Sequence, residues 1–442
     1  MDIMVILELI VLLGAIFVGI RLGGIAIGYA GGLGVVILSL VLGMKPGSIP
    51  WDVILIIAAA IAAISAMQQA GGLDYMVRVV EKLLRANPRF INYLAPACGW
   101  LLTILAGTGN AVFSLMPVVV DVAKSQNIRP SAPLSLMVVS SQIGITASPV
   151  SAAVVYMSGV LEGFGWNYPT LIGIWIVTTF IACMATAFIV SLITPLDLSK
   201  DPVYQERLKA GLVKDAGEIL HGTDKPGAKL SVGIFLFTVL AVVLYATAIS
   251  NNIKWIDPVI MPRDAAIMSF LLTAAALITW LCKVEPGKIL DTSVFKSGMT
   301  ACVCVFGVAW LGNTFVAGHE QAIKDVAGEW VKQTPALLAV AFFFASMLLY
   351  SQAATAKAIT PVIISALGIA TVADSGMLVA CFAAVSALFV LPTYPTLLGA
   401  VQMDDTGSTR IGKFIFNHAF FLPGVLAIAI AVALGFLVIS LF

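Results

Sequence analysis

One lysine, Lys357, falls inside an apolar stretch of the chain and not at its edge, within residues 350–361. A charged side chain at mid-bilayer depth costs about 2.5–3.5 kcal/mol on insertion scales, so it persists where a counter-charge, an unwound backbone or a water-filled cavity receives it. Lys357 therefore indicates a candidate site for an anion. Two structural alternatives stay open: its side chain could reach the membrane surface, or it could pair with an internal carboxylate.

The composition around this lysine is that of a membrane protein. The 442 residues are 60% hydrophobic and 11% charged, with a mean hydropathy of +1.04. We therefore expect an all-α polytopic membrane protein and no separately folded soluble domain. The net charge is +1 and the basic residues are dispersed, which is not typical of nucleic-acid binding.

The reactive residue types give no sign of an enzyme or of a metal site. Six cysteines lack paired spacing, and three histidines lie in separate segments. Phosphate-binding loops, zinc-protease motifs, nucleophile elbows and dinucleotide fingerprints are not found in the sequence. We expect no cofactor and no metal.

Apolar runs of about 17–25 residues have the length that spans hydrocarbon as helix. Two further apolar stretches, 94–120 and 335–368, are interrupted by polar and small residues, which predicts a re-entrant hairpin in each. The expected spans are ten: 3–20, 24–43, 52–71, 134–162, 169–195, 230–250, 264–282, 297–317, 376–403 and 414–441.

The order of these elements repeats. Residues 1–195 hold five spans with a hairpin before the fourth, residues 196–229 form a polar linker, and residues 230–442 repeat the pattern. An odd number of spans inverts the second half, which predicts an inverted repeat. We expect scaffold segments at 1–93 and 230–318 and transport segments at 94–195 and 335–442.

Charge bias sets the expected orientation. With the N-terminus outside, 18 of the 24 Lys and Arg residues fall on the cytoplasmic side. The positive-inside rule then predicts a cytoplasmic linker at 196–229 and both termini in the periplasm.

Polar and proline residues mark the candidate binding site. The hairpin tips, 107–110 and 351–355, and two proline-containing breaks, 145–151 and 391–396, occupy matching places in the two halves. Because proline leaves backbone groups without intrahelical partners, such breaks can contact a ligand; an ordinary kink filled by neighbouring hydroxyls is the alternative. The candidate substrate-binding residues are Thr108, Gly109, Asn110, Thr146, Ser148, Pro149, Ser151, Ser351, Gln352, Thr355, Lys357, Thr393, Tyr394 and Thr396.

Two other segments indicate structural roles. Gly24, Gly28 and Gly32 recur at four-residue spacing, which favours close helix contact. Residues 74–89 are amphipathic and basic, which is typical of a helix along the inner membrane surface.

Several segments together resemble one family. They are ELI at 8–10, RLGGIAIG at 21–28, AGTGN at 106–110, TASPVSAAVVY at 146–156, SQAATAK at 351–357, LPTYPTL at 391–397 and VQMDDTG at 401–407. In these the chain resembles the anaerobic C4-dicarboxylate transporter (Dcu) family, A type, of the ion transporter superfamily. The resemblance covers essentially the whole chain.

The resemblance implies a homodimeric, elevator-type antiporter of the bacterial inner membrane that exchanges fumarate, L-aspartate and malate for succinate. Its partners would be these substrates and membrane lipid. Related sodium symporters carry Ser-Asn-Thr at both hairpin tips, and this chain does not. We therefore expect exchange without sodium, with a sodium- or proton-coupled dicarboxylate symporter as the alternative. Helix N-termini at the tips, together with Lys357, would neutralise the two carboxylates.

Overall fold

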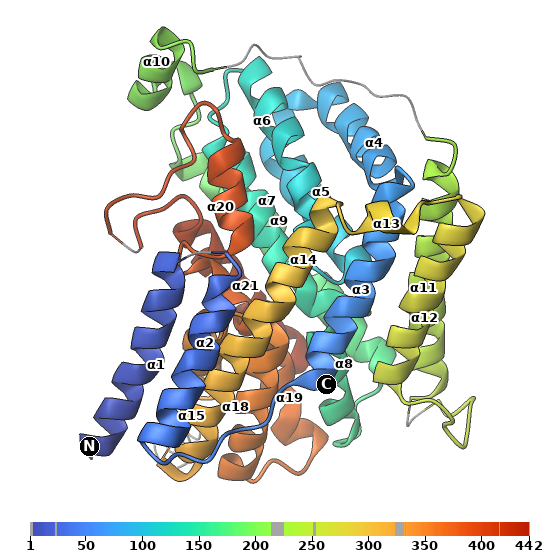
Figure 1. The fold of residues 1–442 in the computed structure, drawn as a ribbon, viewed down its shortest axis with the longest axis vertical. Helices are drawn as coiled ribbons and strands as arrows, with labels where there is room; N and C mark the ends of the chain where they lie inside the picture. Colours follow the sequence, from blue (N-terminus) through green and yellow to red (C-terminus); the bar gives the residue numbers. More distant parts are fainter. Residues whose placement is uncertain are drawn as a thin grey trace.

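The structure is a computed structural model that describes residues 3–22, 24–213, 225–250, 253–322, 331, 333–414 and 416–441. Within these ranges it consists of helices joined by loops, with two isolated β-bridges (Figure 1). The first half contains α1 (Ile3–Leu22), α2 (Ala26–Val36), a π-helical turn (Ile37–Val41), α3 (Trp51–Gln69), α4 (Gly72–Ala86), α5 (Ile91–Ala106), α6 (Met116–Ser125), α7 (Ser131–Gly144), α8 (Ala152–Glu162) and α9 (Tyr168–Ile193). The second half contains α11 (Ala228–Ala248), α12 (Arg263–Leu281), α13 (Pro286–Ile289), α14 (Ser293–Cys304), a π-helical turn (Val305–Ala309), α15 (Trp310–Gly318), α17 (Leu337–Leu349), α18 (Gln352–Leu367), α19 (Val372–Cys381), a 3-10 segment (Phe382–Phe389), α20 (Pro395–Met403) and α21 (Phe421–Ile439).

Nine helices in the described part of the chain are long and apolar enough to cross a membrane. The nine differ in membership from the expected ten. The apolar helices Ile3–Gly19 and Ala26–Val41 are shorter than the others, whereas Pro88–Ala106, the first arm of the hairpin predicted at 94–120, is long and apolar enough to be counted. The predicted span at 376–403 consists of α19, a 3-10 segment and α20, and the predicted span at 414–441 becomes helical only at Phe421. Of the expected linker, η5 (Leu198–Lys200) and α10 (Pro202–Lys209) are described, while residues 214–224 lie outside the described ranges.

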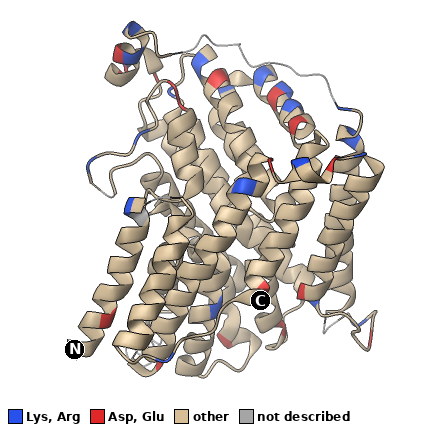
Figure 2. Cartoon of the chain, viewed as in Figure 1, with Lys and Arg blue, Asp and Glu red and all other residues tan. Residues whose placement is uncertain are grey.

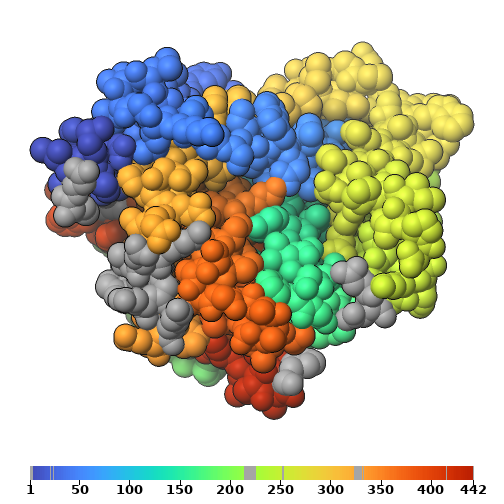
Figure 3. All heavy atoms as spheres, turned by 90° about the horizontal axis from the view of Figure 1, so that it is seen from below, coloured from blue at the N-terminus to red at the C-terminus, as the bar shows by residue number. Residues whose placement is uncertain are grey.

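The helices pack into two groups. In one group α3 contacts α12 and α14, α11 contacts α12 and α4, and α2 contacts α1 and the π-helical turn after α14. In the other group α7 contacts α5 and α9, and α21 contacts α9 and α19. Helices from the two halves of the sequence therefore mix within each group. Figure 3 shows α18 and α19 (orange) beside α8 (teal) on the lower face, and both helices contact α8 there.

Both predicted hairpins turn back at their polar tips. The first consists of α5, a 3-10 turn at Gly109–Ser114, and α6. The second consists of α17 and α18, which meet at Tyr350 and Ser351. Gly107 and Tyr350 both have left-handed backbone conformations, with φ of 70° and 56°, which end the first helix of each hairpin.

Both predicted breaks are also present. After α7 a short 3-10 turn (Ile145–Ala147) leads into extended backbone at Ser148 and Ser151 before α8 begins. In the second half, the chain is extended at Tyr394 before α20 begins at Pro395. The prediction that proline-containing segments interrupt the two helices is confirmed.

Glycines allow α2 to cross α14 and the following π-helical turn at backbone distance. A Cβ on Gly28 would lie 2.2 Å from the carbonyl oxygen of Val303, and one on Gly307 would lie 1.8 Å from that of Gly28. The packing prediction is thus confirmed at Gly28. It is wrong for Gly24 and Gly32, where a Cβ would meet nothing within 4 Å. Gly31 shares the contact instead, because positions three apart also lie on one helix face.

Most Lys and Arg residues gather at one end of the molecule, around α4, α6 and α10 (Figure 2). We call this end the charged face. Helix α4 is the amphipathic segment expected at 74–89, and its Arg85 lies 2.7 Å from both Glu81 and Asp121. The pair with Asp121 joins α4 to α6 at this face, and the pair with Glu81 lies within α4.

Candidate functional site

The two hairpin tips and the two helix breaks line one small cavity. Its volume is about 60 Å³, and it lies between the two packing groups. The lining residues include six of the predicted ones: Thr108, Asn110, Ser151, Ser351, Gln352 and Tyr394. The remaining side of the cavity is closed by Ile57 of α3, Ala301 of α14 and Val305, which belong to the packing group that contains α3, α12 and α14.

Helix N-termini surround this cavity. Ser151 caps α8 by accepting a hydrogen bond from Val154 N (3.2 Å), and Ser351 caps α18 by accepting one from Ala354 N (3.2 Å). Thr108 accepts from Asn110 N (3.3 Å) and begins the 3-10 turn of the first tip. The first amides of each helix have no intrahelical acceptor and carry partial positive charge. None of the described residues that line the cavity is Asp, Glu, Lys or Arg, so the helix N-termini are the source of partial positive charge beside it.

Several predicted hydroxyls are used to hold the first break in shape. Thr146 Oγ1 donates to Ile143 O (2.7 Å), and Ser148 Oγ donates to Ile104 O (2.6 Å) across the gap to α5. Pro149 O accepts from the Tyr168 hydroxyl (3.5 Å). These three residues are not among those that line the cavity. They position the first break against the first hairpin.

The second hairpin and second break meet through two tyrosines. The rings of Tyr350 and Tyr394 are 5.9 Å apart, and both line the cavity. The Tyr350 hydroxyl and Thr393 Oγ1 are buried and find no hydrogen-bond partner among the described residues. A buried polar group without a partner costs free energy, so a polar ligand would stabilise this region. Thr355 is bonded within its helix, to Ser351 O (2.8 Å), and does not line the cavity.

Sequence reasoning missed Gln142, which connects three of the four segments. Its Nε2 donates to Thr396 Oγ1 (3.0 Å), and Gln352 Nε2 approaches its main-chain oxygen (3.3 Å) and its Oε1 (3.4 Å). A Cβ on Gly109 would lie 3.1 Å from Gln142 Nε2, so the first tip also packs here. A signal existed, because Gln142 is the one amide side chain within residues 131–162.

Lys357 lies outside this cavity. It forms an ion pair with Asp52 in the first turn of α3, and its Nζ lies 5.4 Å from the centre of the Tyr156 ring. Both charged residues line a separate cavity of about 380 Å³ toward the face opposite the charged face. In this arrangement Lys357 has an internal carboxylate as its partner, one of the two alternatives that the sequence left open.

An all-helical chain with nine candidate membrane spans in its described part, together with hairpins and broken helices around one cavity, defines a polytopic membrane protein. The model of a family described as anaerobic C4-dicarboxylate membrane transporter matches residues 4–442. The chain belongs to this family, and its function is transport and not catalysis.

Curated relatives cover nearly the whole chain. It is 62% identical over 435 residues to the C4-dicarboxylate transporter DcuA of Wolinella succinogenes, covering 98% of this chain and 99% of that one. It is 54% identical over 433 residues to the C4-dicarboxylate transporter DcuA of Escherichia coli strain K12, covering 98% of each. The solved YdaH transporter of Alcanivorax borkumensis resembles it in fold alone, with a TM-score of 0.53 and 13% identity over 87% of this chain and 84% of that one.

Proposed function

We propose that the protein is a secondary antiporter that exchanges C4-dicarboxylates, among them fumarate, L-aspartate, malate and succinate, across the bacterial inner membrane. The observation that carries the proposal is the cavity between the two tips and the two breaks, with the N-termini of α8 and α18 beside it. A dicarboxylate brings about two negative charges out of water, and charge must be compensated there. Amides at helix N-termini compensate it at both ends of the substrate.

The division of the helices into two packing groups supports a transporter in which one part moves and the other stays fixed. We assign residues 94–195 and 335–442 to a transport part, and residues 1–93 and 230–318 to a scaffold part, as in an elevator. The cavity lies where the groups meet, with Ile57, Ala301 and Val305 on the scaffold side. The two halves would be inverted repeats, and two chains would form a homodimer through their scaffold parts.

The charged face is assigned to the cytoplasm and the ends of the chain to the periplasm. The concentration of Lys and Arg at this face supports the assignment through the positive-inside rule (Figure 2). The Lys357–Asp52 cavity then opens toward the periplasm.

The hairpin tips support exchange without a coupling cation. They read Gly-Thr-Gly-Asn at 107–110 and Ser-Gln-Ala-Ala-Thr at 351–355, and neither has the Ser-Asn-Thr of the sodium symporters. The sodium- or proton-coupled symporter remains the alternative function.

Counterflow in proteoliposomes tests the proposal. Vesicles loaded with succinate should take up labelled fumarate and L-aspartate at equal rates in sodium and in choline buffer, and empty vesicles should not. Asn110→Ala removes an amide that lines the cavity and should reduce uptake at least tenfold, because a hydrogen bond to a charged group contributes about 1.5–3 kcal/mol. Asn87→Ala, an exposed amide at the end of α4, is the matched control. Uptake that needs a sodium gradient, or equal uptake into empty vesicles, would refute antiport.

A further inference from the structure

A larger cavity lies at the charged face, away from the site between the hairpins. Its volume is about 330 Å³, and its polar lining residues include Ser131, Ser135, Ser408, Arg410, Asn417 and His418. Helix α7 runs from this cavity to the first break, so its 14 residues separate the two sites by roughly 20 Å. The two cavities share no lining residue.

The segment 404–409, which follows α20 and reaches this cavity at Ser408, is held by hydrogen bonds to one carboxylate. The Asp404 carboxylate is 1% exposed and accepts hydrogen bonds from Thr406 N (3.0 Å), Ser408 Oγ (2.9 Å) and Thr409 N (2.6 Å). Ser408 Oγ in turn accepts from Ser131 N (3.1 Å), the first residue of α7. The loop is thereby fixed to the start of α7 before any ligand arrives, which lowers the entropic cost of binding.

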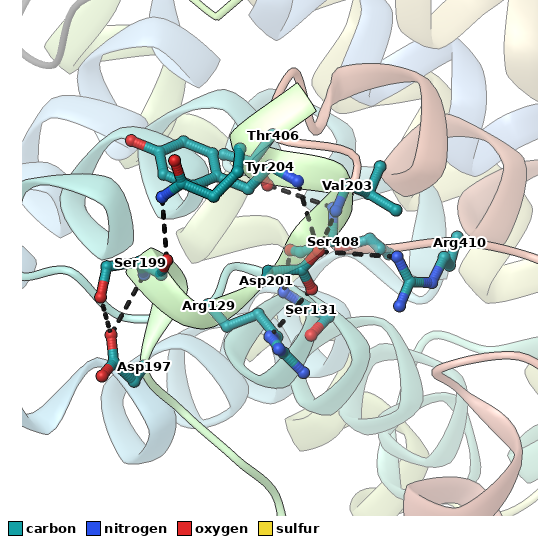
Figure 4. A network of polar contacts seen from close by, with 12 residues as sticks. Arg129, Ser131, Asp197, Ser199, Asp201, Val203, Tyr204, Thr406, Ser408 and Arg410 are labelled. Carbon is teal, nitrogen blue, oxygen red and sulfur yellow. Dashed lines mark hydrogen bonds and ion pairs between the residues drawn. The ribbon is translucent and has the colours of Figure 1, made fainter. Parts of the chain in front are cut away.

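Two guanidinium groups and two buried carboxylates lie beside the cavity, and Asp404 is already occupied by the hydrogen bonds that hold the loop. Figure 4 shows Arg129 and Arg410 approaching Asp201 from two sides. Arg129 lies 3.1 Å from the Asp201 carboxylate, which also accepts from Val203 N and Tyr204 N, whereas Arg410 lies 3.6 Å away. One buried carboxylate thus serves two guanidinium groups, and the Arg410 side chain remains 51% exposed.

Two helices begin at the same cavity. Ser131 starts α7, and Leu422 and Pro423 lie in the first turn of α21. Both helices are long enough to direct a dipole, and their N-termini favour an anion. Among the described residues that line the cavity, Arg410 is the one that carries a permanent charge, and none is acidic.

His418 adds a buried polar atom that has no partner. The residue is 9% exposed, and its Nε2 lies 3.1 Å from Val390 O. Because a carbonyl oxygen only accepts, Nε2 carries the hydrogen, and Nδ1 finds no partner in the described part of the chain. Burial lowers the pKa of the ring, so Nδ1 is an acceptor at neutral pH. A ligand group that donates a hydrogen bond would satisfy it.

We infer that this cavity is a second carboxylate-binding site, at which a small dicarboxylate with a hydrogen-bond donor binds on its way between the cytoplasm and the central cavity. Arg410 pairs with one carboxylate, for which its planar guanidinium offers two parallel hydrogen bonds. Ser131, Ser408 and Asn417 supply further polar contacts. The inference rests on the proposed function for the identity of the ligand and for the side it faces.

The first test counts sites. Purified protein is titrated with L-malate, whose hydroxyl can donate a hydrogen bond, and we expect two molecules bound per chain. Arg410→Gln should bind one, while Lys413→Gln, which removes an exposed charge three residues away, should still bind two. Arg410→Lys keeps the charge without the paired donors and should recover part of the second binding event. One molecule per wild-type chain, or two per Arg410→Gln chain, would overturn the inference.

The second test uses the sidedness of transport. In vesicles of known orientation, Arg410→Gln should raise the half-saturating malate concentration about tenfold on the cytoplasmic side and leave the periplasmic side unchanged, as expected for losing one charged hydrogen bond. Equal changes on both sides, or none, would contradict it. Inorganic phosphate that displaces the second malate as strongly as succinate does would assign the cavity to phosphate-type anions instead. If wild-type protein shows no exchange, the proposed function fails, whereas the titration still decides whether the cavity binds carboxylates.

Discussion

Replacing Lys357 by methionine separates the two roles that this lysine can have. Its ion pair with Asp52 joins α18, in the proposed transport part, to α3, in the proposed scaffold part. If α18 moves along α3 during transport, the pair must break, and a substrate carboxylate can replace Asp52 as the partner of the ammonium group. Lys357 would then be the charge partner of the substrate, as its position in the sequence predicts.

The size of the effect differs between the two roles. The side chains of Lys357 and Asp52 are 20% and 42% exposed, so solvent screens their attraction. Such a pair contributes less than about 1 kcal/mol, and the contact with the Tyr156 ring adds about 0.5–1 kcal/mol. Lys357→Met should therefore leave folding intact. The free energy lost with a hydrogen bond to a substrate carboxylate is larger, about 1.5–3 kcal/mol, which corresponds to a roughly 10- to 150-fold increase in the dissociation constant.

The assay is succinate binding and counterflow in the two single variants and in the double variant Lys357→Met/Asp52→Asn. We expect Lys357→Met to weaken binding at least tenfold and Asp52→Asn to preserve it, because the asparagine no longer competes for the ammonium group. The double variant should remain as weak as Lys357→Met. Lys45→Met, an exposed lysine on a loop before α3, is the control. If the double variant regains wild-type binding, Lys357 serves only to neutralise Asp52, and its assignment to the substrate is refuted.

Two further substitutions test how the site is positioned and how the helices pack. Gln142→Leu removes buried hydrogen bonds, each of which costs about 1–3 kcal/mol when its partner is left unsatisfied. The exchange rate should therefore fall at least tenfold, while the control Gln402→Leu, at an exposed position, should exchange normally. Gln142→Asn keeps the amide and should recover part of the rate. A normal rate in Gln142→Leu would show that the central amide is dispensable. Gly28→Val places side-chain atoms against Val303 O and should abolish the folded species in size-exclusion chromatography, whereas Gly32→Val faces open space and should fold; well-folded Gly28→Val would contradict the close helix crossing.

Much of the architecture follows from local features of the sequence. Runs of apolar residues must become helices in a membrane because their backbone groups have no other hydrogen-bond partners there, which is why most element positions agree with expectation. Proline at 149 and at 392 and 395 removes donors wherever the rest of the chain lies, so both breaks were readable. The hairpin tips at 107–110 and 351–355 were readable because polar and small residues interrupt an otherwise apolar run.

Other features depend on which segments meet in three dimensions. The two breaks hold five serine and threonine side chains, and chemical type alone does not distinguish Ser151, which lines the cavity, from Ser148, which donates a hydrogen bond to α5. The role of Gln142 depends on Thr396 and Gln352, more than 200 positions away in the chain. In α2 the glycines in contact are Gly28 and Gly31, and not the predicted Gly24 and Gly32, because the crossing angle with α14 decides which residues touch.

The sequence by itself determined that this protein is an all-helical membrane transporter of a known family and where its helices break, because length, hydropathy and proline act locally. Only the tertiary structure decided that Lys357 pairs with Asp52, that Gln142 joins the two halves at the centre, and that Arg410 borders a second cavity at the charged face. Partners of charged and amide groups are chosen by proximity in space, and a single sequence does not record distances between its distant parts.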